Sequence, residues 1–212
     1  VGSYYGELMK DITDRNHVRE LVSDAATAKM CAWDLGMSDS TSIWVAEIIG
    51  GEIRLMDYYE NNGQSLSHYI EWLDEKGYRD YTHILPHDVM VKELQTGKSR
   101  FEFLSDAGLQ IDVAPKSSVE DGIQAVRRMI PNCWFNKDTT RQGVECLRNY
   151  RRVFNEKLNV FQEKPLHDWS SHCADAFRYL ALGLDTATIQ RSNWGKPYET
   201  TYDGESYKQQ YL

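Results

Sequence analysis

The spacing of hydrophobic positions changes several times along this chain, and each change predicts a new element. Residues 29–35, 42–49 and 52–59 carry apolar side chains at consecutive or alternating positions, which is typical of β-strands. The second run is apolar on both faces, so it should lie in a sheet that is covered on both sides. Between the second and third runs, Gly50-Gly51 predicts a tight two-residue turn.

Helical spacing follows this three-stranded unit. Apolar residues three or four positions apart predict a helix over residues 66–73, and Lys76-Gly77 is a typical stop signal. Residues 81–85 form the next expected strand, which Pro86 ends. Because a helix precedes it, this strand should lie parallel to a partner in the same sheet.

The second half of the chain alternates between the two periodicities. We expect helices over residues 101–107, 119–130, 140–151 and 170–184 there, and strands over residues 109–114 and 133–135. Before the first strand, residues 4–10 and 17–22 are also expected to be helical. Residues 153–165 fit either an irregular segment or a hairpin, and residues 153–164 are our candidate for a mobile element. The alternation predicts an α/β fold with a mixed sheet flanked by helices.

Composition divides the chain into three parts. Residues 1–24 are polar and read as a lead-in from a preceding domain, residues 25–185 as the α/β domain, and residues 186–212 as a polar C-terminal tail. The chain starts at Val1 without a methionine, which suggests a fragment, although a processed or tagged start would look the same. No stretch is apolar for long enough to span a bilayer, and no signal peptide is present.

Taken alone, the net charge of −8 argues against a nucleic-acid binder, because phosphate contacts need lysine and arginine. Several basic residues nevertheless fall in the middle and second half, where they would either contact a DNA backbone or form a solvated surface. These DNA-backbone candidates are Lys116, Arg127, Arg128, Arg148 and Arg151. The four cysteines form no CxxC pair, so we expect reduced core residues and no zinc site of cysteines.

A single carboxylate, Asp34, interrupts the apolar run of the first strand. Ionised carboxylates are rarely buried unless they are paired or coordinate a metal. We therefore predict that Asp34 is the first ligand of a metal site, with pairing to a buried arginine as the alternative. Asp39, in the turn that follows, is either a further metal ligand or an Asx-turn residue.

Two later carboxylates would complete this site. Asp88 follows the strand over residues 81–85, so it comes near Asp34 if the two strands are neighbours. Capping the next segment is its alternative role. Asp175 lies at the start of the last expected helix, and a surface ion pair with Arg178 is its alternative. Three aspartates suit two Mg²⁺ or Mn²⁺ ions, which can activate a water and stabilise the leaving oxygen of a phosphodiester.

Three neighbouring residues could support these carboxylates. His87 could be a metal ligand, a proton shuttle or only a turn residue. His172 lies one turn before Asp175, and Asp168 competes with Asp175 from the preceding loop.

Two nucleotide-binding motifs fail. Residues 96–99, TGKS, resemble the end of a Walker A loop, but the first glycine of that motif would fall at Lys92. Residues 34–36 with Thr41 also resemble the phosphate hairpin of actin-like and sugar-kinase ATPases. Those proteins need a second related domain, and this chain is too short to hold one.

Four segments carry a resemblance to a known family: GSYYGEL, AWDLGMSDSTSIW, the LPHD of residues 85–88, and HDWSSHCADAFRYLALG. Over nearly the whole chain up to about Asp185, the sequence resembles the C-terminal nuclease domain of the large terminase subunit of tailed bacteriophages. The resemblance implies a ribonuclease H-like fold and a metal-dependent endonuclease that cuts concatemeric double-stranded DNA during packaging. By position, Asp34, Asp88 and Asp175 match the acidic triad of the family, and Asp39 matches a less regular fourth acid.

The same resemblance implies the cofactors and partners. It implies two ions of Mg²⁺ or Mn²⁺ per site, a portal protein and a small terminase subunit as partners, an N-terminal ATPase domain in the full-length chain, and the host cell cytoplasm as the location. The alternatives are a DNA- or portal-docking module with a silent nuclease, or another ribonuclease H-like nuclease such as a junction resolvase or an RNA–DNA hybrid nuclease. A mononuclear zinc hydrolase that uses His87, His167 or His172 has no HExxH-type spacing to support it.

Overall fold

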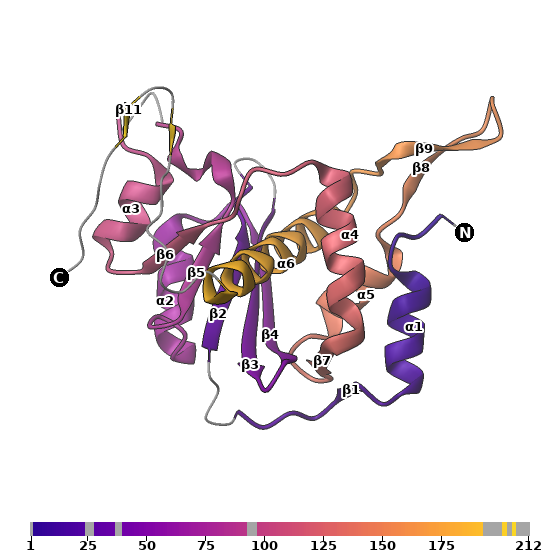
Figure 1. Ribbon diagram of the computed structural model, residues 1–212, viewed down its shortest axis with the longest axis horizontal. Coiled ribbons are helices and arrows are strands. Elements are labelled where there is room, and N and C mark those ends of the chain that lie inside the picture. Colours follow the sequence, from indigo (N-terminus) through magenta and orange to yellow (C-terminus); the bar gives the residue numbers. More distant parts are fainter. Residues whose placement is uncertain are drawn as a thin grey trace.

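The computed structural model describes residues 2–23, 28–36, 40–92, 97–192, 201–202 and 205–206. A seven-stranded sheet in the order β1-β7-β4-β3-β2-β5-β6 forms its centre, and helices cover both faces (Figure 1). The strands are β1 (Val18–Arg19), β2 (Ala28–Asp34), β3 (Ser40–Ile49), β4 (Glu52–Asn62), β5 (Thr82–Leu85), β6 (Gln110–Val113) and β7 (Cys133–Asn136).

The helices alternate with these strands as the spacing predicts. They are α1 (Gly6–Asp14), α2 (Leu66–Lys76), α3 (Arg100–Asp106), α4 (Val119–Met129), α5 (Arg141–Asn149) and α6 (Ser171–Ser192), with 3₁₀ turns η1 (His87–Met90) and η2 (Ile130–Asn132). Two short ladders complete the chain: β8 (Arg152–Asn155) with β9 (Val160–Pro165), and β10 (Thr201–Tyr202) with β11 (Glu205–Ser206). Within the described residues, no helix has the length and apolar character needed to cross a membrane.

The sheet is mixed, with an antiparallel part formed by β2, β3 and β4 and a parallel part formed by β2, β5 and β6. β2, β3 and β4 are antiparallel neighbours, and the turn between β3 and β4 uses Gly50 and Gly51 at φ +56° and +92°, as a two-residue hairpin requires. β5 lies parallel to β2, and β6 lies parallel to β5. The predicted parallel placement of residues 81–85 is therefore confirmed, and the carboxyl ends of β2 and β5 meet at one edge.

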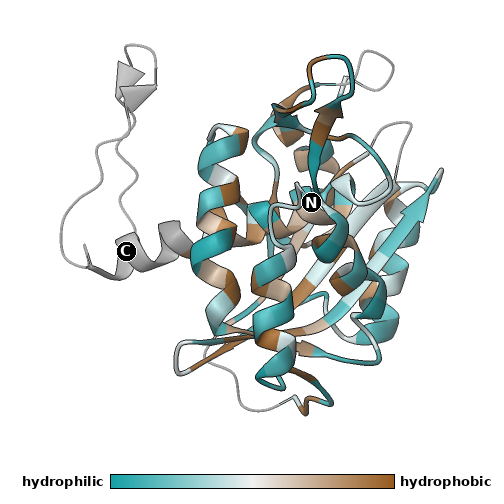
Figure 2. Cartoon of the chain, turned by 90° about the vertical axis from the view of Figure 1, so that its right-hand side faces the viewer, coloured by the Kyte–Doolittle hydropathy of each residue, from teal (hydrophilic) through white to brown (hydrophobic). Residues whose placement is uncertain are grey.

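Two hydrophobic cores lie on opposite faces of the sheet. Ala32 and Trp44 belong to the core that contains α6, whereas Trp33 and Val45 belong to the core that contains α2. Since side chains alternate along a strand, Asp34 lies on the same face as Ala32 and points toward α6. The helices in Figure 2 alternate between hydrophilic and hydrophobic segments, as helices with one buried face do.

The first 24 residues correct one sequence expectation. Residues 17–22 do not form a helix: Val18 and Arg19 pair in parallel with Phe135 and Asn136 of β7. The edge of β7 presents backbone N–H and C=O groups with which these residues can pair, whereas a short isolated helix would be only marginally stable. α1 contributes its fully buried Met9 and Ile12 to the α6 core. The core thus extends across residue 24, and the proposed division into three parts stays a prediction.

The segment after α5 forms a hairpin, which decides between the two alternatives for residues 153–165. β8 and β9 are antiparallel, and the rings of Phe154 and Phe161 lie 4.9 Å apart between them. The hairpin projects from the body of the protein (Figure 1). Its base is held where Arg152 N donates a 3.0 Å hydrogen bond to Gly2 O. Helix α6 continues past Asp185 to Ser192, so the predicted polar tail begins inside a helix.

Candidate active site at the carboxyl edge of the sheet

Asp34 is the last residue of β2, and its carboxylate meets the first turn of α6. Asp34 Oδ2 lies 2.9 Å from Nδ1 of His172, so it accepts a hydrogen bond when that nitrogen carries the proton. The two side chains are 16% and 15% exposed, which leaves a small opening to solvent. The sequence singled out both residues, and the structure brings them together across the gap between sheet and helix.

Asp175 lies one turn further along α6. Its Oδ1 accepts a 2.9 Å hydrogen bond from Nη2 of Arg178. Burial and, to a smaller extent, the nearby carboxylate of Asp34 raise the pKa of Asp175 to about 6, against the opposing effect of Arg178 and His172. Asp34 and Asp175 are therefore close enough to repel each other, although they come from a strand and a distant helix.

Asp88 lies in η1, directly after β5, and its side chain is exposed. Because β5 is the parallel neighbour of β2, Asp88 and Asp34 follow the carboxyl ends of adjacent strands. Tyr179, one turn after Asp175, links the three carboxylates electrostatically. Burial, opposed by the charge of Arg178 and aided by the charges of Asp34, Asp175 and Asp88, raises the pKa of Tyr179 to about 12.

Carboxylates such as these suit a hard divalent cation, although the three side chains are not gathered around one point. Across the described part of the chain, no three His, Cys, Asp or Glu side chains are grouped so that they could hold a metal ion. The mutual repulsion between Asp34 and Asp175 is nevertheless the electrostatic situation that a cation between them would relieve. Carboxylate oxygens are the preferred ligands of Mg²⁺ and Mn²⁺. Asp39 lies outside the described residues.

Asp168, which the sequence offered as a competitor of Asp175, bonds to the turn before α6 and to Arg151. Its Oδ1 accepts hydrogen bonds from the backbone N and from Oγ of Ser170, at 2.9 and 2.6 Å, and its Oδ2 lies 3.2 Å from Arg151 Nη2. These bonds hold the turn that starts α6. His167 contacts the same turn through Ser171 Oγ at 3.1 Å, and His87 is exposed at the start of η1.

Several of the predicted DNA-backbone residues contact other parts of the chain. Arg127 Nε donates to the backbone O of Tyr4, Arg148 Nη2 donates to Thr13 Oγ1, and Arg151 pairs with Asp168. Lys116 and Arg128 are exposed. The role of these five residues in DNA binding stays a prediction.

Sequence reasoning missed the burial of Arg178. The predicted pair with Asp175 exists, but it is not a surface pair, because only 9% of the Arg178 side chain is exposed. The arginine stem crosses α4 at Gly122, where a Cβ would collide with Arg178 Cδ. A glycine in the middle of an amphipathic helix is the one signal in the sequence for this close approach.

Comparison with known proteins finds solved structures of similar fold, but no match among family models or curated proteins. Among solved structures, the large terminase from a thermophilic bacteriophage in complex with ATP-gamma-S is 19% identical, with a TM-score of 0.64. That match covers 82% of this chain and 44% of the terminase chain.

Two isolated nuclease domains match over almost their whole length. The P22 large terminase nuclease domain is 17% identical with a TM-score of 0.60, over 80% of this chain and 89% of the other. The g2p (large terminase) nuclease domain from bacteriophage SPP1 with bound Mn is 15% identical with a TM-score of 0.56, over 87% and 99%.

The chain therefore has the ribonuclease H-like fold of large terminase nuclease domains, and the fold predicted from the resemblance is confirmed. It spans 44% of the length of the large terminase that was solved with ATP-gamma-S.

Proposed function

We propose that this chain is the metal-dependent endonuclease domain of a viral terminase large subunit, which cuts concatemeric double-stranded DNA during genome packaging. The observation that carries the proposal is that Asp34 and Asp175 lie within electrostatic reach of each other at the carboxyl edge, with Asp88 following the neighbouring parallel strand. The bound Mn of the SPP1 domain and the fold shared with three terminases support it.

The residues of the chain have distinct tasks in this proposal. Asp34, Asp88 and Asp175 would hold two Mg²⁺ or Mn²⁺ ions, with Asp39 as a further candidate. When bound, two such ions activate a water and stabilise the leaving oxygen of the scissile phosphodiester. His172 orients the Asp34 carboxylate through their 2.9 Å contact, and Arg178 holds Asp175 in place. Such an arrangement acts on phosphates and not on base edges, so it would cut with little sequence preference.

The wider setting belongs to the same proposal. The terminase solved with ATP-gamma-S is more than twice as long as the region of it that matches this chain. By analogy, we infer an N-terminal ATPase domain in the full-length protein, with a portal protein and a small terminase subunit as partners in the host cytoplasm. In this setting the domain would cut the DNA that the motor moves.

The test is plasmid cleavage by the purified chain with Mg²⁺, with Mn²⁺ or with EDTA. We expect nicking and linearisation with either metal, none with EDTA, and loss of cleavage in Asp34→Ala and in Asp175→Ala. Asp138→Ala, which removes an exposed acid after β7, is the matched control and should cut like the parent. Full activity in the Asp34→Ala protein would refute the site.

One observation favours a second candidate, a DNA- or portal-docking module with a silent nuclease. The carboxylates of the described residues do not form an assembled three-ligand group. DNA binding without cleavage under every metal condition would support this candidate over the first.

A further inference from the structure

A cleft of about 770 Å³ opens beside Asp175. Its walls come from α4, from the base of the β8–β9 hairpin and from the first turns of α6, and the three elements lie close together in Figure 1. This volume falls within the range of pockets that hold drug-sized ligands, so a nucleotide unit fits. The cleft is continuous with the candidate active site, since Asp175 is part of its lining.

The charged lining of the cleft consists of three cations and two carboxylates. Arg152 and Lys164 lie on the two strands of the hairpin and are exposed, and Arg178 lies deeper. Arg178 is already paired with Asp175, so Glu120 is the acid that opposes the two hairpin cations. A local excess of positive charge in a chain of net charge −8 is an electrostatic feature that favours an anion.

Arg152 is held in place for such a contact. Its guanidinium carbon lies 5.4 Å from the centre of the Tyr4 ring, a cation–π arrangement that orients the planar group. A planar guanidinium binds phosphate oxygens through two parallel hydrogen bonds, whereas the Lys164 ammonium acts as a mobile point charge. Together the two side chains offer one oriented and one adaptable phosphate contact.

We propose that this cleft binds backbone phosphates of the nucleic-acid strand next to the phosphodiester that is cut, with Arg152 and Lys164 as the direct contacts. The assignment of the neighbouring phosphodiester rests on the proposed function, but the affinity of the cleft for a phosphate backbone does not depend on cleavage. The strand leaves the carboxylates between α4 and the hairpin. These two contact residues are not among the DNA-backbone candidates predicted from the sequence. Of those candidates, Arg127, Arg148 and Arg151 contact other parts of the chain.

The test measures binding of a fluorescently labelled short DNA duplex in EDTA, where no metal-dependent cleavage occurs, over a series of KCl concentrations. Each phosphate contact contributes about 0.9 to the slope of log affinity against log salt. We expect the double variant Arg152→Ala/Lys164→Ala to lower the magnitude of that slope by about 2, and to weaken binding about tenfold or more at moderate salt. Arg152→Lys keeps the charge and should keep most of the slope.

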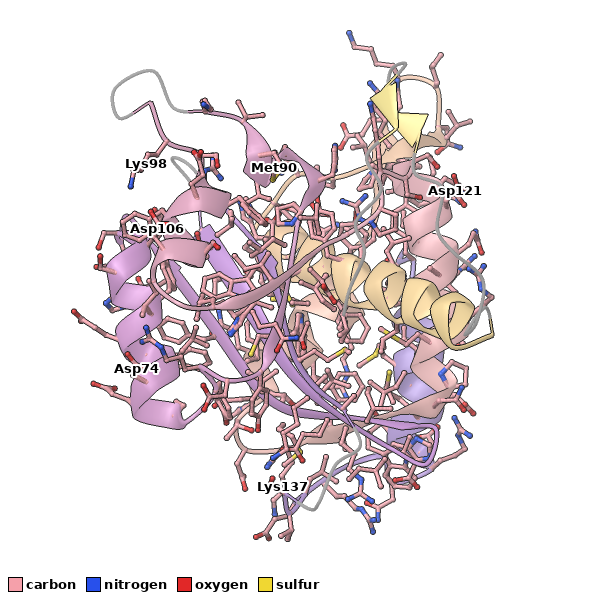
Figure 3. The ribbon with its side chains drawn as sticks, turned by 60° about the vertical axis from the view of Figure 1, so that its left-hand side comes forward. Asp74, Met90, Lys98, Asp106, Asp121 and Lys137 are labelled. Atoms are coloured by element: carbon pink, nitrogen blue, oxygen red, sulfur yellow. The ribbon has the colours of Figure 1, made fainter. Side chains whose placement is uncertain are left out.

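The matched control removes two exposed cations elsewhere. Lys137 lies at the end of the molecule opposite to Asp121, which is in the first turn of α4 (Figure 3), and Arg141 starts α5. Lys137→Ala/Arg141→Ala should keep the parent slope. Thermal unfolding of each variant verifies that it is folded.

Two results would overturn the proposal: a cleft variant with the parent slope, or a parent protein that binds no DNA in EDTA. If the cleft variant has a smaller slope of log affinity against log salt but the parent protein cuts no plasmid, the phosphate-binding cleft is supported and the proposed nuclease function is refuted.

Discussion

Two pairs of buried or partly buried carboxylates lie on opposite faces of the same sheet, and they differ in what surrounds them. On the α2 face, Glu47 Oε1 accepts hydrogen bonds from Ser23 Oγ at 2.8 Å and Tyr81 Oη at 3.1 Å. Asp57 accepts from the backbone N of Tyr58 at 2.8 Å and from Tyr78 Oη at 3.2 Å. On the α6 face, Asp34 and Asp175 have His172 and Arg178 as partners and repel each other.

This contrast shows that burial alone does not identify a cation site. Glu47 is 1% exposed, yet two hydroxyl groups and Lys29, whose Nζ lies 3.6 Å away, stabilise it within the fold. Hydroxyl donors and one nearby ammonium group can stabilise a single buried carboxylate, but hydrogen-bond donors do not remove the repulsion between two neighbouring carboxylates. The geometry that favours a cation is the second carboxylate.

Neutralising one acid of each pair tests this distinction most directly. Asp34→Asn should lower cleavage by more than about a hundredfold, beyond the usual effect of residues behind metal ligands, because it removes the charge that is proposed to hold the ions. Glu47→Gln should leave cleavage within about twofold and lower the melting temperature by about 2–4 °C, since one buried contact weakens. Plasmid cleavage and thermal unfolding of both proteins measure this, and equal losses of activity would contradict the distinction.

Removal of Arg178 should destabilise the fold more than neutralisation of Glu47 does. Arg178→Ala leaves Asp175 without its ion-pair partner in a largely buried setting, which costs about 3–5 kcal/mol in comparable pairs. The double variant Asp175→Asn/Arg178→Met removes both charges and should recover much of that loss. Chemical denaturation gives the free energies of unfolding. A single variant as stable as the parent would show that the pair contributes little.

His172 should affect metal affinity more than stability. His172→Ala removes the group that orients Asp34, and the loss of a residue behind a metal ligand typically weakens metal binding about 10–100-fold. The Mn²⁺ concentration for half-maximal cleavage measures this. His68→Ala is the control, because His68 contacts Tyr59 on the α2 face. An unchanged Mn²⁺ requirement in His172→Ala would remove this orienting role.

The smallest effect concerns the pH dependence of stability. Burial raises the pKa of Asp57, so the folded protein retains this proton at a pH where the unfolded chain has lost it. Stability from this group therefore falls as the pH rises above the ordinary aspartate value. Asp57→Asn keeps an acceptor and cannot ionise, so its advantage in melting temperature should grow from acid to neutral pH, to about 2 °C. A constant difference between the proteins across this range would contradict the assignment.

Much of the architecture could be predicted from local patterns. The runs before and after Gly50-Gly51 became β3 and β4, and the helix before residues 81–85 correctly indicated that β5 lies parallel to a sheet partner. That same argument placed Asp88 at the edge where β2 ends. The short strand β1 escaped prediction because its ladder partner, β7, lies in the distant second half of the chain.

Local patterns were enough to predict most of the helices and strands, a sheet covered on both faces, and Asp34 as a candidate site residue, because hydrophobic spacing and a charge within an apolar run can be read from neighbouring residues. Which side chains come together depends on the folded structure. It paired Asp34 with His172, buried Arg178 against α4 at Gly122, and formed the cleft with Arg152 and Lys164. These contacts join residues far apart in the chain, and their energies depend on distance and burial, which no spacing of residues along a sequence specifies.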